Sequence, residues 1–505
     1  MERRRNSGRL PRLGAMQSAL APMRRMACAR LPRAGLRRLS AAPYVEWSEA
    51  GQRQAAAAIA DRGAALGIHF YQFAWVDLFG VQRSKLVPAN RVQELAKSGA
   101  GFAGFAAHLD MDPTMGDLLA MPDASTLVAL PWKPGVGWVA CDLVHEGREL
   151  PHGPRNVLRK VLRALDGKGI AMKTGVECEF FLFAGEVKEA NGLISPKPSD
   201  VLDTQQKPCY DAHALMRRYD LVSKMSEYME EMGWGPYQAD HEDASGQFEV
   251  NWDYDDALKT ADRVVLFKYM TRVLAEEAGL RASFMPKPFA NLTGSGCHAH
   301  ISLHDNVTGA NICGDKTSAQ HSISQTGLSF VAGLLKHARA SAAITNPTVN
   351  SYKRLGARTT SSGATWSPGA VTWAGNNRTA LVRVPDGPKR FELRGADMAA
   401  NPYLFAAAVG AAGLDGLETA ARPPPPADIN MYDSQDPAVA AVRASSDSLP
   451  ADLGEALRDF KASAALRAGL GADFCDSYSK LRDAHWSEYS NAQISQWEFQ
   501  HYLDC

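Results

Sequence analysis

The sequence predicts an α+β protein in which helices pack against a mostly antiparallel sheet. Segments such as residues 69–76 alternate apolar and polar side chains with the period of a strand. Other segments, above all residues 212–232 and 257–278, repeat apolar residues at helical spacing over several turns. At 505 residues the chain is long enough for two or more domains and a large core.

Residues 1–42 are set apart by their charge. From residue 3 to residue 44 the chain is rich in arginine and contains no acidic residue. This composition is typical of an organellar transit peptide and predicts a mitochondrial protein, with a plastid protein as the alternative. A second alternative is a later translation start at Met16, Met23 or Met26, in which case we expect a cytoplasmic protein.

Residues 43–148 are predicted to form a small domain with a mixed β-sheet. The alternating segments 69–76 and 81–87 form a hairpin with Asp77 in its turn. The other predicted elements are helices at 50–66 and 90–98, an acidic, methionine-rich loop at 110–123, and short strands at 127–130 and 137–143.

Residues 149–505 form the second, larger predicted domain. Pro151 and Pro154 mark its start, and an apolar strand follows at 175–183. Four consecutive prolines at 423–426 predict a rigid spacer before a mostly helical end. The predicted helices are residues 156–167, 212–232, 257–278, 327–343 and 402–417.

The composition argues against several functions. The formal net charge is zero, so we expect no nucleic-acid partner. No apolar stretch is long enough to span a bilayer, so we expect no membrane partner either. The eight cysteines lack a CxxC pair, which argues against a structural zinc site and is typical of a reducing compartment.

Two acids interrupt the apolar strand at 175–183. Side chains of a strand alternate between its faces, so Glu177 and Glu179 point to the same side. Burying two unpaired carboxylates together is costly, and one or two divalent metal ions would offset their charge. The alternative is an edge strand whose acids face water.

The segment 240–249 places further acids around a turn. Gly246 lets the backbone reverse, so that Glu242 and Glu249 can face one point from two adjacent strand ends. The alternative is that these acids are solvated, as acids that flank a turn usually are.

A glycine-rich approach at 293–296 leads into a strand with two histidines. His298 and His300 share one face of this strand because they lie two residues apart. Two imidazoles on one face are candidates for a metal ligand and a phosphate contact. A lone histidine would more simply belong to the core or the surface.

Arginines recur in the last third of the chain. Arg390, Glu392 and Arg394 share one face of a predicted strand. A solvated ladder of ion pairs is one interpretation. The other is a site for polyanionic substrates, because arginine binds carboxylate and phosphate groups through two hydrogen bonds. The arginines concerned are Arg354, Arg378, Arg383, Arg390 and Arg394.

Taken in chain order, these segments resemble the glutamine synthetase family of the bacterial type I architecture. The resemblance runs from about Ile68 to the carboxyl terminus. It includes the Asp77 hairpin, the acids of strand 175–183, the Gly246 turn and the histidine strand. The matching motifs lie at residues 76–80, 121–126, 177–183, 246–249, 284–288, 294–302, 345–355, 377–379 and 390–394.

The resemblance implies a small N-terminal β-grasp-like domain and a large catalytic domain with a curved antiparallel sheet and flanking helices. It implies an ATP-dependent ligase that forms a γ-glutamyl amide from glutamate and ammonia through γ-glutamyl phosphate. Two divalent cations, Mg²⁺ or Mn²⁺, belong to such a site. By motif, one would be bound by Glu179, Glu242 and Glu249, and the other by Glu177, His298 and Glu392.

The resemblance also implies roles for the remaining site residues. Asp77 would bind ammonium in the active site of a neighbouring subunit, within a ring-shaped homo-oligomer that we expect to be a dodecamer. The expected catalytic residues are Asp77, Arg378 and Glu392. Glutamate would be bound by Gly294, Arg354 and Arg394, and ATP with its phosphates by His300, Ser302, Arg378, Arg383 and Arg390.

One loop departs from the family pattern. The family carries a flap glutamate shortly after the motif at 345–355, but no acid occurs between Arg354 and Asp386. The amine pocket is therefore expected to be less anionic, with Trp366 or Trp373 at its wall. This neutral loop resembles that of a branch containing both glutamine synthetases and γ-glutamylmethylamide synthetases, so methylamine or another small alkylamine is an alternative acceptor.

A further alternative is a catalytically inactive relative with a structural role. It is disfavoured because all six implied metal ligands and all five arginines are present. Tyr432 lies where some bacterial enzymes of the family are modified, and we expect it to be an ordinary surface tyrosine.

Overall fold

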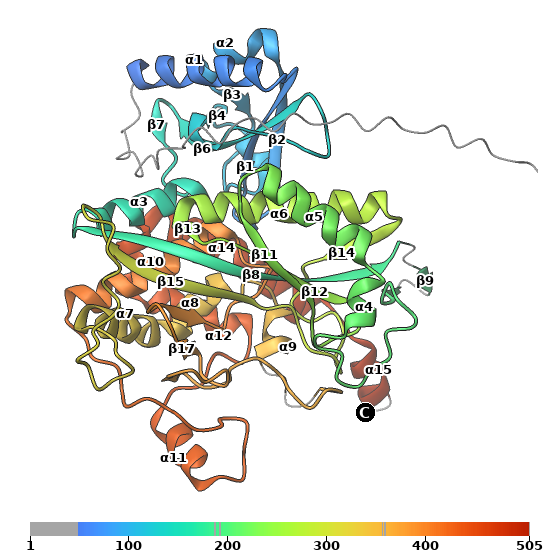
Figure 1. Ribbon diagram of the computed structural model, residues 1–505, viewed down its shortest axis with the longest axis vertical. Coiled ribbons are helices and arrows are strands. Elements are labelled where there is room, and N and C mark those ends of the chain that lie inside the picture. Colours follow the sequence, from blue (N-terminus) through green and yellow to red (C-terminus); the bar gives the residue numbers. More distant parts are fainter. Residues whose placement is uncertain (1–48, 186–187, 191–192, 356, 358–359, 504–505) are drawn as a thin grey trace, which may run out of the picture. The chain divides into compact units, whose positions relative to one another are not determined.

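The computed structural model describes residues 49–503 except 186–187, 191–192, 356 and 358–359. The described residues belong to one compact unit. The segment predicted as a transit peptide, residues 1–42, lies outside the described residues. Helices and largely antiparallel sheets build the described unit (Figure 1), so the predicted α+β class is confirmed.

The amino-terminal part of this unit is built on a seven-stranded sheet with the order β2-β1-β6-β4-β3, in which β5 and β7 also pair with β6. β1 and β6 run parallel, whereas the other pairs are antiparallel. The elements are α1 (Glu49–Ala65), β1 (Phe70–Val76), β2 (Gln82–Pro88), α2 (Val92–Ser98), β3 (Ala100–Phe102), β4 (Leu118–Pro122), β5 (Val128–Ala129), β6 (Val136–His145) and β7 (Arg148–Glu149).

β4 occupies residues that the sequence assigned to an irregular acidic loop. Its side chains Leu118 and Ala120 are fully buried, and the strand pairs with both β3 and β6. A strand of this kind is stabilised by partners that are distant in the sequence, so its local pattern does not reveal it.

A nine-stranded sheet forms the second part, with the order β11-β12-β8-β15-β18-β17-β16 and with β13 and β14 also paired to β8. The long strands β8 and β15 run side by side through its centre (Figure 1). The strands are β8 (Ile170–Ala184), β11 (Pro236–His241), β12 (Gln247–Trp252), β13 (Asp255–Asp256), β14 (Leu280–Ser283), β15 (Cys297–Asp305), β16 (Trp373–Ala374), β17 (Val382–Arg383) and β18 (Phe391–Leu393).

One face of β8 packs against helices. Cys178 and Phe180 are fully buried, and the Phe180 ring lies 6.0 Å from that of Phe267 on α6 (Ala257–Glu277). These contacts confirm the prediction that the side of this strand opposite Glu177 and Glu179 faces the core. The opposite face, which carries Glu177 and Glu179, is the face of the candidate site.

The helices pack around α10 (Pro402–Glu418), which is buried along most of its length and contacts α3, α6, α7, α8 and α13. Within the part of the chain that the structure describes, no helix is long and apolar enough to cross a membrane. The helices not yet given are α3 (Pro154–Asp166), α4 (Ala212–Met216), α5 (Tyr219–Glu231), α7 (Gln325–Lys336), α8 (Ala338–Thr345), α9 (Ser351–Leu355), α11 (Pro437–Ser445), α12 (Leu453–Ala462), α13 (Ala464–Leu470), α14 (Ala472–Ser487) and α15 (Gln496–Tyr502).

Two helices predicted as continuous are divided. The predicted helix at 212–232 is α4 followed by α5, and the one at 327–343 is α7 followed by α8. In the second case the break is at His337, whose Nε2 lies 2.8 Å from Asp415 Oδ2 on α10. A hydrophobic period carries through such a break, so the sequence pattern does not show it.

A buried ionic cluster joins the two sheet-bearing parts. Arg155 of α3 is 4% exposed and donates to Asp142 of β6, to Asp123 after β4 and to Asp262 of α6. Arg159 donates to Asp123 as well. Removing one partner of a buried ion pair is destabilising, because it leaves a buried charge without compensation. The predicted domain boundary after residue 148 stays a prediction.

Candidate functional site

The register of four strands brings acids and imidazoles to one face of the second sheet. Glu179 of β8 lies opposite Glu249 of β12. Glu177, two residues earlier on the same face, lies opposite His298 of β15. Glu392 of β18 in turn lies opposite His300. Because antiparallel partners stand side by side, residues far apart in the sequence form one continuous polar wall.

The strands β11 and β12 and the turn between them supply further acids. Gly246 has φ of 73°, a conformation that favours glycine, and it closes the reversal that the sequence predicted. The carboxylates of Asp240, Glu242 and Glu249 offer oxygens that all lie within 4.8 Å of one another. Sequence reasoning missed Asp240. Its spacing of two residues from Glu242, which repeats that of Glu177 and Glu179, is the signal that could have found it.

Crowding of like charges marks this acid group. Burial, together with the neighbouring charges of Glu179 and Asp240, raises the pKa of Glu242 well above its usual range. Burial and the charge of Glu177 do the same to the pKa of Glu249. Burial and nearby acids raise the pKa of Asp240 to about 6. A divalent cation bound among these oxygens would remove the repulsion.

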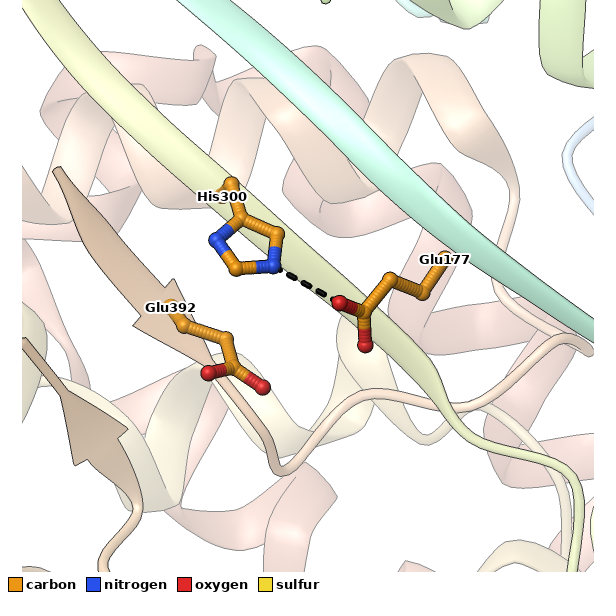
Figure 2. Close-up of side chains that lie close together, drawn as sticks. All are labelled: Glu177, His300 and Glu392. Atoms are coloured by element: carbon orange, nitrogen blue, oxygen red, sulfur yellow. Dashed lines mark hydrogen bonds and ion pairs between the residues drawn. The ribbon is translucent and has the colours of Figure 1, made fainter. Parts of the chain in front are cut away.

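A second group converges from three strands. Figure 2 shows Glu177, His300 and Glu392 pointing toward one another, and their ligand atoms lie within 4.8 Å. Glu177 Oε1 lies 2.9 Å from His300 Nε2, and its Oε2 lies 3.0 Å from His298 Nδ1. Burial by itself would raise the pKa of Glu177, but the two imidazoles outweigh it and lower that pKa well below its ordinary value.

The donor atoms of the two groups fit divalent cations, and a buried histidine near them has a ring nitrogen that the described residues leave free. His298 is 6% exposed, and its Nε2 has no hydrogen-bond partner among the described residues. A Cβ placed on Gly296 would lie 2.8 Å from Glu179 Oε1, 2.9 Å from His298 Nε2 and 2.8 Å from an Arg354 nitrogen. Glycine at this position therefore lets a carboxylate, an imidazole and a guanidinium approach the backbone closely. Carboxylate oxygens with one imidazole suit Mg²⁺ or Mn²⁺.

The predicted arginines surround these acids. Arg394 and Arg383 donate to the two oxygens of Glu392, in the latter case over 2.6 Å. The charge of Arg394 outweighs burial and lowers the pKa of Glu392. Arg390 Nε lies 3.1 Å from His300 Nδ1. Arg378 is exposed, and its carbonyl accepts a hydrogen bond from Arg394 Nε.

Arg354 is a buried cation that donates hydrogen bonds to backbone oxygens. It is 3% exposed and donates to the carbonyls of Gly395 and Arg394. Its side chain lies against Gly294, whose carbonyl accepts from Gln247 Nε2. Burial lowers the pKa of Arg354, although Glu179 opposes this. An anionic substrate group would offset the buried charge.

Asp77 and Ser302 lie in local networks of their own. Asp77 is fully buried in its hairpin, where Oδ1 accepts from the backbone of Phe79 and Val81 and Oδ2 accepts from Arg83. This arrangement gives Asp77 a structural task, and its expected role toward an amine stays a prediction. Ser302, two residues beyond His300, pairs with His304 Nε2 at 3.0 Å.

Trp366 and Trp373 are the two residues expected at the wall of the amine pocket, and of these only Trp366 lies in the neutral loop. Trp373 is fully buried in β16 and donates to the carbonyl of Pro424. Trp366 is partly exposed and donates from Nε1 to Asp243 Oδ2 over 2.7 Å. Asp243 directly follows Glu242, so the Trp366 ring is tied to the acid group.

Comparison with known proteins identifies the family. The family model described as "Glutamine synthetase, catalytic domain" matches residues 151–502. The chain belongs to the glutamine synthetase family. It is 51% identical over 437 residues to a glutamine synthetase of Rhizobium leguminosarum bv. phaseoli, covering 86% of this chain and 97% of that protein. The family predicted from the sequence motifs is therefore confirmed.

The chain is also similar to proteins that are not named glutamine synthetase. A glutamate–methylamine ligase of Methyloversatilis universalis is 40% identical over 434 residues, covering 85% of this chain and 95% of that protein. A solved structure described as a GmaS/ADP complex is 50% identical, with a TM-score of 0.81, and covers 88% of this chain and 99% of that one.

The expected organellar location is wrong. Two glutamine synthetases that are 51% and 49% identical over 86% and 87% of this chain come from Rhizobium species, bacteria that have no mitochondria or plastids. The expectation rested on the arginine-rich composition of residues 1–42 alone. Composition reports charge and amphipathicity, and these features also occur in segments that are not import signals.

Proposed function

We propose that the protein is an ATP-dependent ligase that joins ammonia to the γ-carboxyl group of glutamate through γ-glutamyl phosphate. The observation that carries this proposal is the convergence of two acid groups, two imidazoles and buried arginines on one face of the second sheet. Phosphoryl transfer needs cations and arginines that neutralise charge on the phosphates, and both kinds of partner fit here.

We assign one cation, Mg²⁺ or Mn²⁺, to Glu179, Glu242 and Glu249 and a second to Glu177, His298 and Glu392. Such cations, when bound, polarise phosphate oxygens and offset their charge. Support comes from the raised pKa values of Glu242 and Glu249 and from the unpartnered His298 Nε2. Asp240 and His300 lie close enough to join these sets.

The arginines divide by their burial. Arg354 and Arg394 are almost inaccessible and lie beside Gly294 and Glu392, which suits a grip on the carboxylate of glutamate. Arg378, Arg383 and Arg390 are more exposed, which suits contacts to the phosphates of ATP, with His300 and Ser302 nearby on β15.

We further propose that Asp77 serves the amine site of a neighbouring subunit in a homo-dodecamer. Apolar side chains lie exposed around its hairpin, including Phe70, Val81 and Leu86. Exposed apolar residues that gather on one hairpin are typical of a subunit contact.

Methylamine is the second candidate acceptor. Loop 360–367 has no acid and presents Trp366 beside the acid group. An apolar wall favours an amine with a methyl group over ammonium. The similarity to a glutamate–methylamine ligase and to GmaS supports the same candidate.

The function is tested with the purified full chain. Release of ADP and phosphate from ATP should require glutamate, Mg²⁺ and an amine together. Running the assay with ammonium and with methylamine in parallel, and following the amide product, decides between the two acceptors. An enzyme without ATP turnover on any amine would contradict both and favour the inactive relative.

A further inference from the structure

Asp243 directly follows Glu242, and one of its carboxylate oxygens accepts hydrogen bonds from the neutral loop 360–367. Asp243 is 5% exposed. Its Oδ2 lies 2.7 Å from Trp366 Nε1, 2.5 Å from Ser362 Oγ and 3.2 Å from Thr293 Oγ1. Hydrogen bonds to a charged acceptor are about twice as strong as neutral ones. Asp243 thus binds loop 360–367 at two points and also holds the segment that leads to Gly294.

The backbone of Trp366 needs such support. Its φ is 53°, in the left-handed region, where a residue with a large side chain is disfavoured. A conformation of this kind persists only where surrounding contacts hold it. The contact at hand is the hydrogen bond from the indole to Asp243.

Asp243 also contacts the acid group of Asp240, Glu242 and Glu249. The backbone N–H of Asp243 donates to Glu242 Oε2 over 3.1 Å. All three donors bond the single oxygen Oδ2, and the loop, which contains no acid, contributes an aromatic ring at this point.

We infer that Asp243 is a positioning residue that fastens loop 360–367 beside the acids, and that the loop, through the indole of Trp366, determines which amine is accepted. The inference rests on the proposed ligase function. An aromatic face contacts the methyl group and the charge of methylammonium together, whereas ammonium offers the charge alone.

The test uses variants that remove single donors. Trp366→Phe keeps an aromatic ring and loses the indole N–H, and Ser362→Ala loses the hydroxyl. Ser361→Ala is the matched control, because the Ser361 hydroxyl bonds the carbonyl of Asn291 instead of Asp243. Asp243→Asn keeps the volume and removes the charge. Hydrogen exchange of peptides covering 360–367 is measured for each variant, together with KM for methylamine, ammonium and ATP.

We expect exchange in the loop to rise about tenfold in Trp366→Phe, Ser362→Ala and Asp243→Asn and to stay near the wild-type rate in Ser361→Ala. We expect the ratio of methylamine to ammonium kcat/KM to change about tenfold in Trp366→Phe while KM for ATP stays within about twofold. These results together support the inference.

Unchanged loop exchange in Trp366→Phe and Asp243→Asn would overturn the anchoring role. Faster exchange with an unchanged amine ratio, or with equal rises in KM for ATP and amine, would overturn the role in specificity. A wild-type enzyme that uses no amine would instead sink the proposed function, and the exchange measurements would still decide whether Asp243 fastens the loop.

Discussion

His298 lies directly opposite Glu177 in the ladder between β8 and β15, and its Nδ1 is 3.0 Å from Glu177 Oε2. The second ring nitrogen, Nε2, is buried without a hydrogen-bond partner among the described residues. A histidine held on one side by a carboxylate and open on the other is arranged as metal-binding histidines are.

Replacing Glu177 by alanine should lower turnover by about a thousandfold or more, because it removes a cation ligand and leaves His298 and His300 without their shared acceptor. Steady-state assays and calorimetric titration with Mn²⁺ measure the two effects. Glu277→Ala, at an exposed ion pair with Lys224, is the control and should leave both unchanged. A near-normal rate in Glu177→Ala would show that the cation assignment is wrong.

Replacing His298 and replacing His300 should have different effects, the first on Mn²⁺ binding and the second on KM for ATP. We expect His298→Ala to weaken Mn²⁺ binding about tenfold or more, because its free Nε2 is the proposed ligand atom. We expect His300→Ala to act chiefly on KM for ATP, since His300 is engaged by Glu177 and Arg390. If only His300→Ala lost Mn²⁺ affinity, His300 would be the cation ligand and His298 the residue that acts on ATP binding.

Separate replacements of Asp77 and of its ion-pair partner Arg83 distinguish an amine contact from a structural role in the hairpin. Asp77→Asn keeps an oxygen for the backbone of Phe79 and Val81 but loses the charge that the proposed amine role needs. We expect KM for the amine to rise about tenfold. Arg83→Met breaks the same ion pair and keeps the carboxylate, so its amine KM should change little. Equal effects in both variants would mean that the hairpin, and not an amine contact, is responsible.

The ionic cluster around Arg155 predicts a pH-dependent stability. Burial by itself would raise the pKa of Asp123, but Arg155 and Arg159 outweigh it and hold that pKa far below its usual value. The folded state therefore binds fewer protons than the unfolded state, so the contribution is complete above a pH of about 5 and is lost as the pH falls further.

Asp123→Asn should lower the free energy of unfolding by about 2–3 kcal/mol at neutral pH, because it leaves Arg155 short of a partner. Urea unfolding of wild type and variant at pH 7, 5 and about 4 measures the difference in their unfolding free energies. This difference should be the same at pH 7 and pH 5 and smaller at about pH 4. Glu149→Gln, at the more exposed pair with Arg163, should cost less than about 1 kcal/mol. If the difference in unfolding free energy grew as the pH fell, the predicted direction of the pH dependence would be wrong.

Much of the site follows from local patterns. Alternation along residues 175–183 placed Glu177 and Glu179 on one face, and Gly246 indicated the turn that brings Glu242 toward Glu249. Both features depend only on strand geometry and on the freedom of glycine. The identity of the neighbours does not follow in this way. Asp240 and His300 joined the two groups once the strand register was known.

By itself, the sequence determined the α+β class, the family and the residue types of the site, because periodicity, turn residues and ordered motifs are local properties of the chain. Only the tertiary structure decided which residues meet: that β4 forms where a loop was expected, that Glu392 stands opposite His300, and that Asp243 takes up Trp366 of the neutral loop. Pairing across strands and contacts between distant loops depend on the whole packed molecule, and no short segment encodes them.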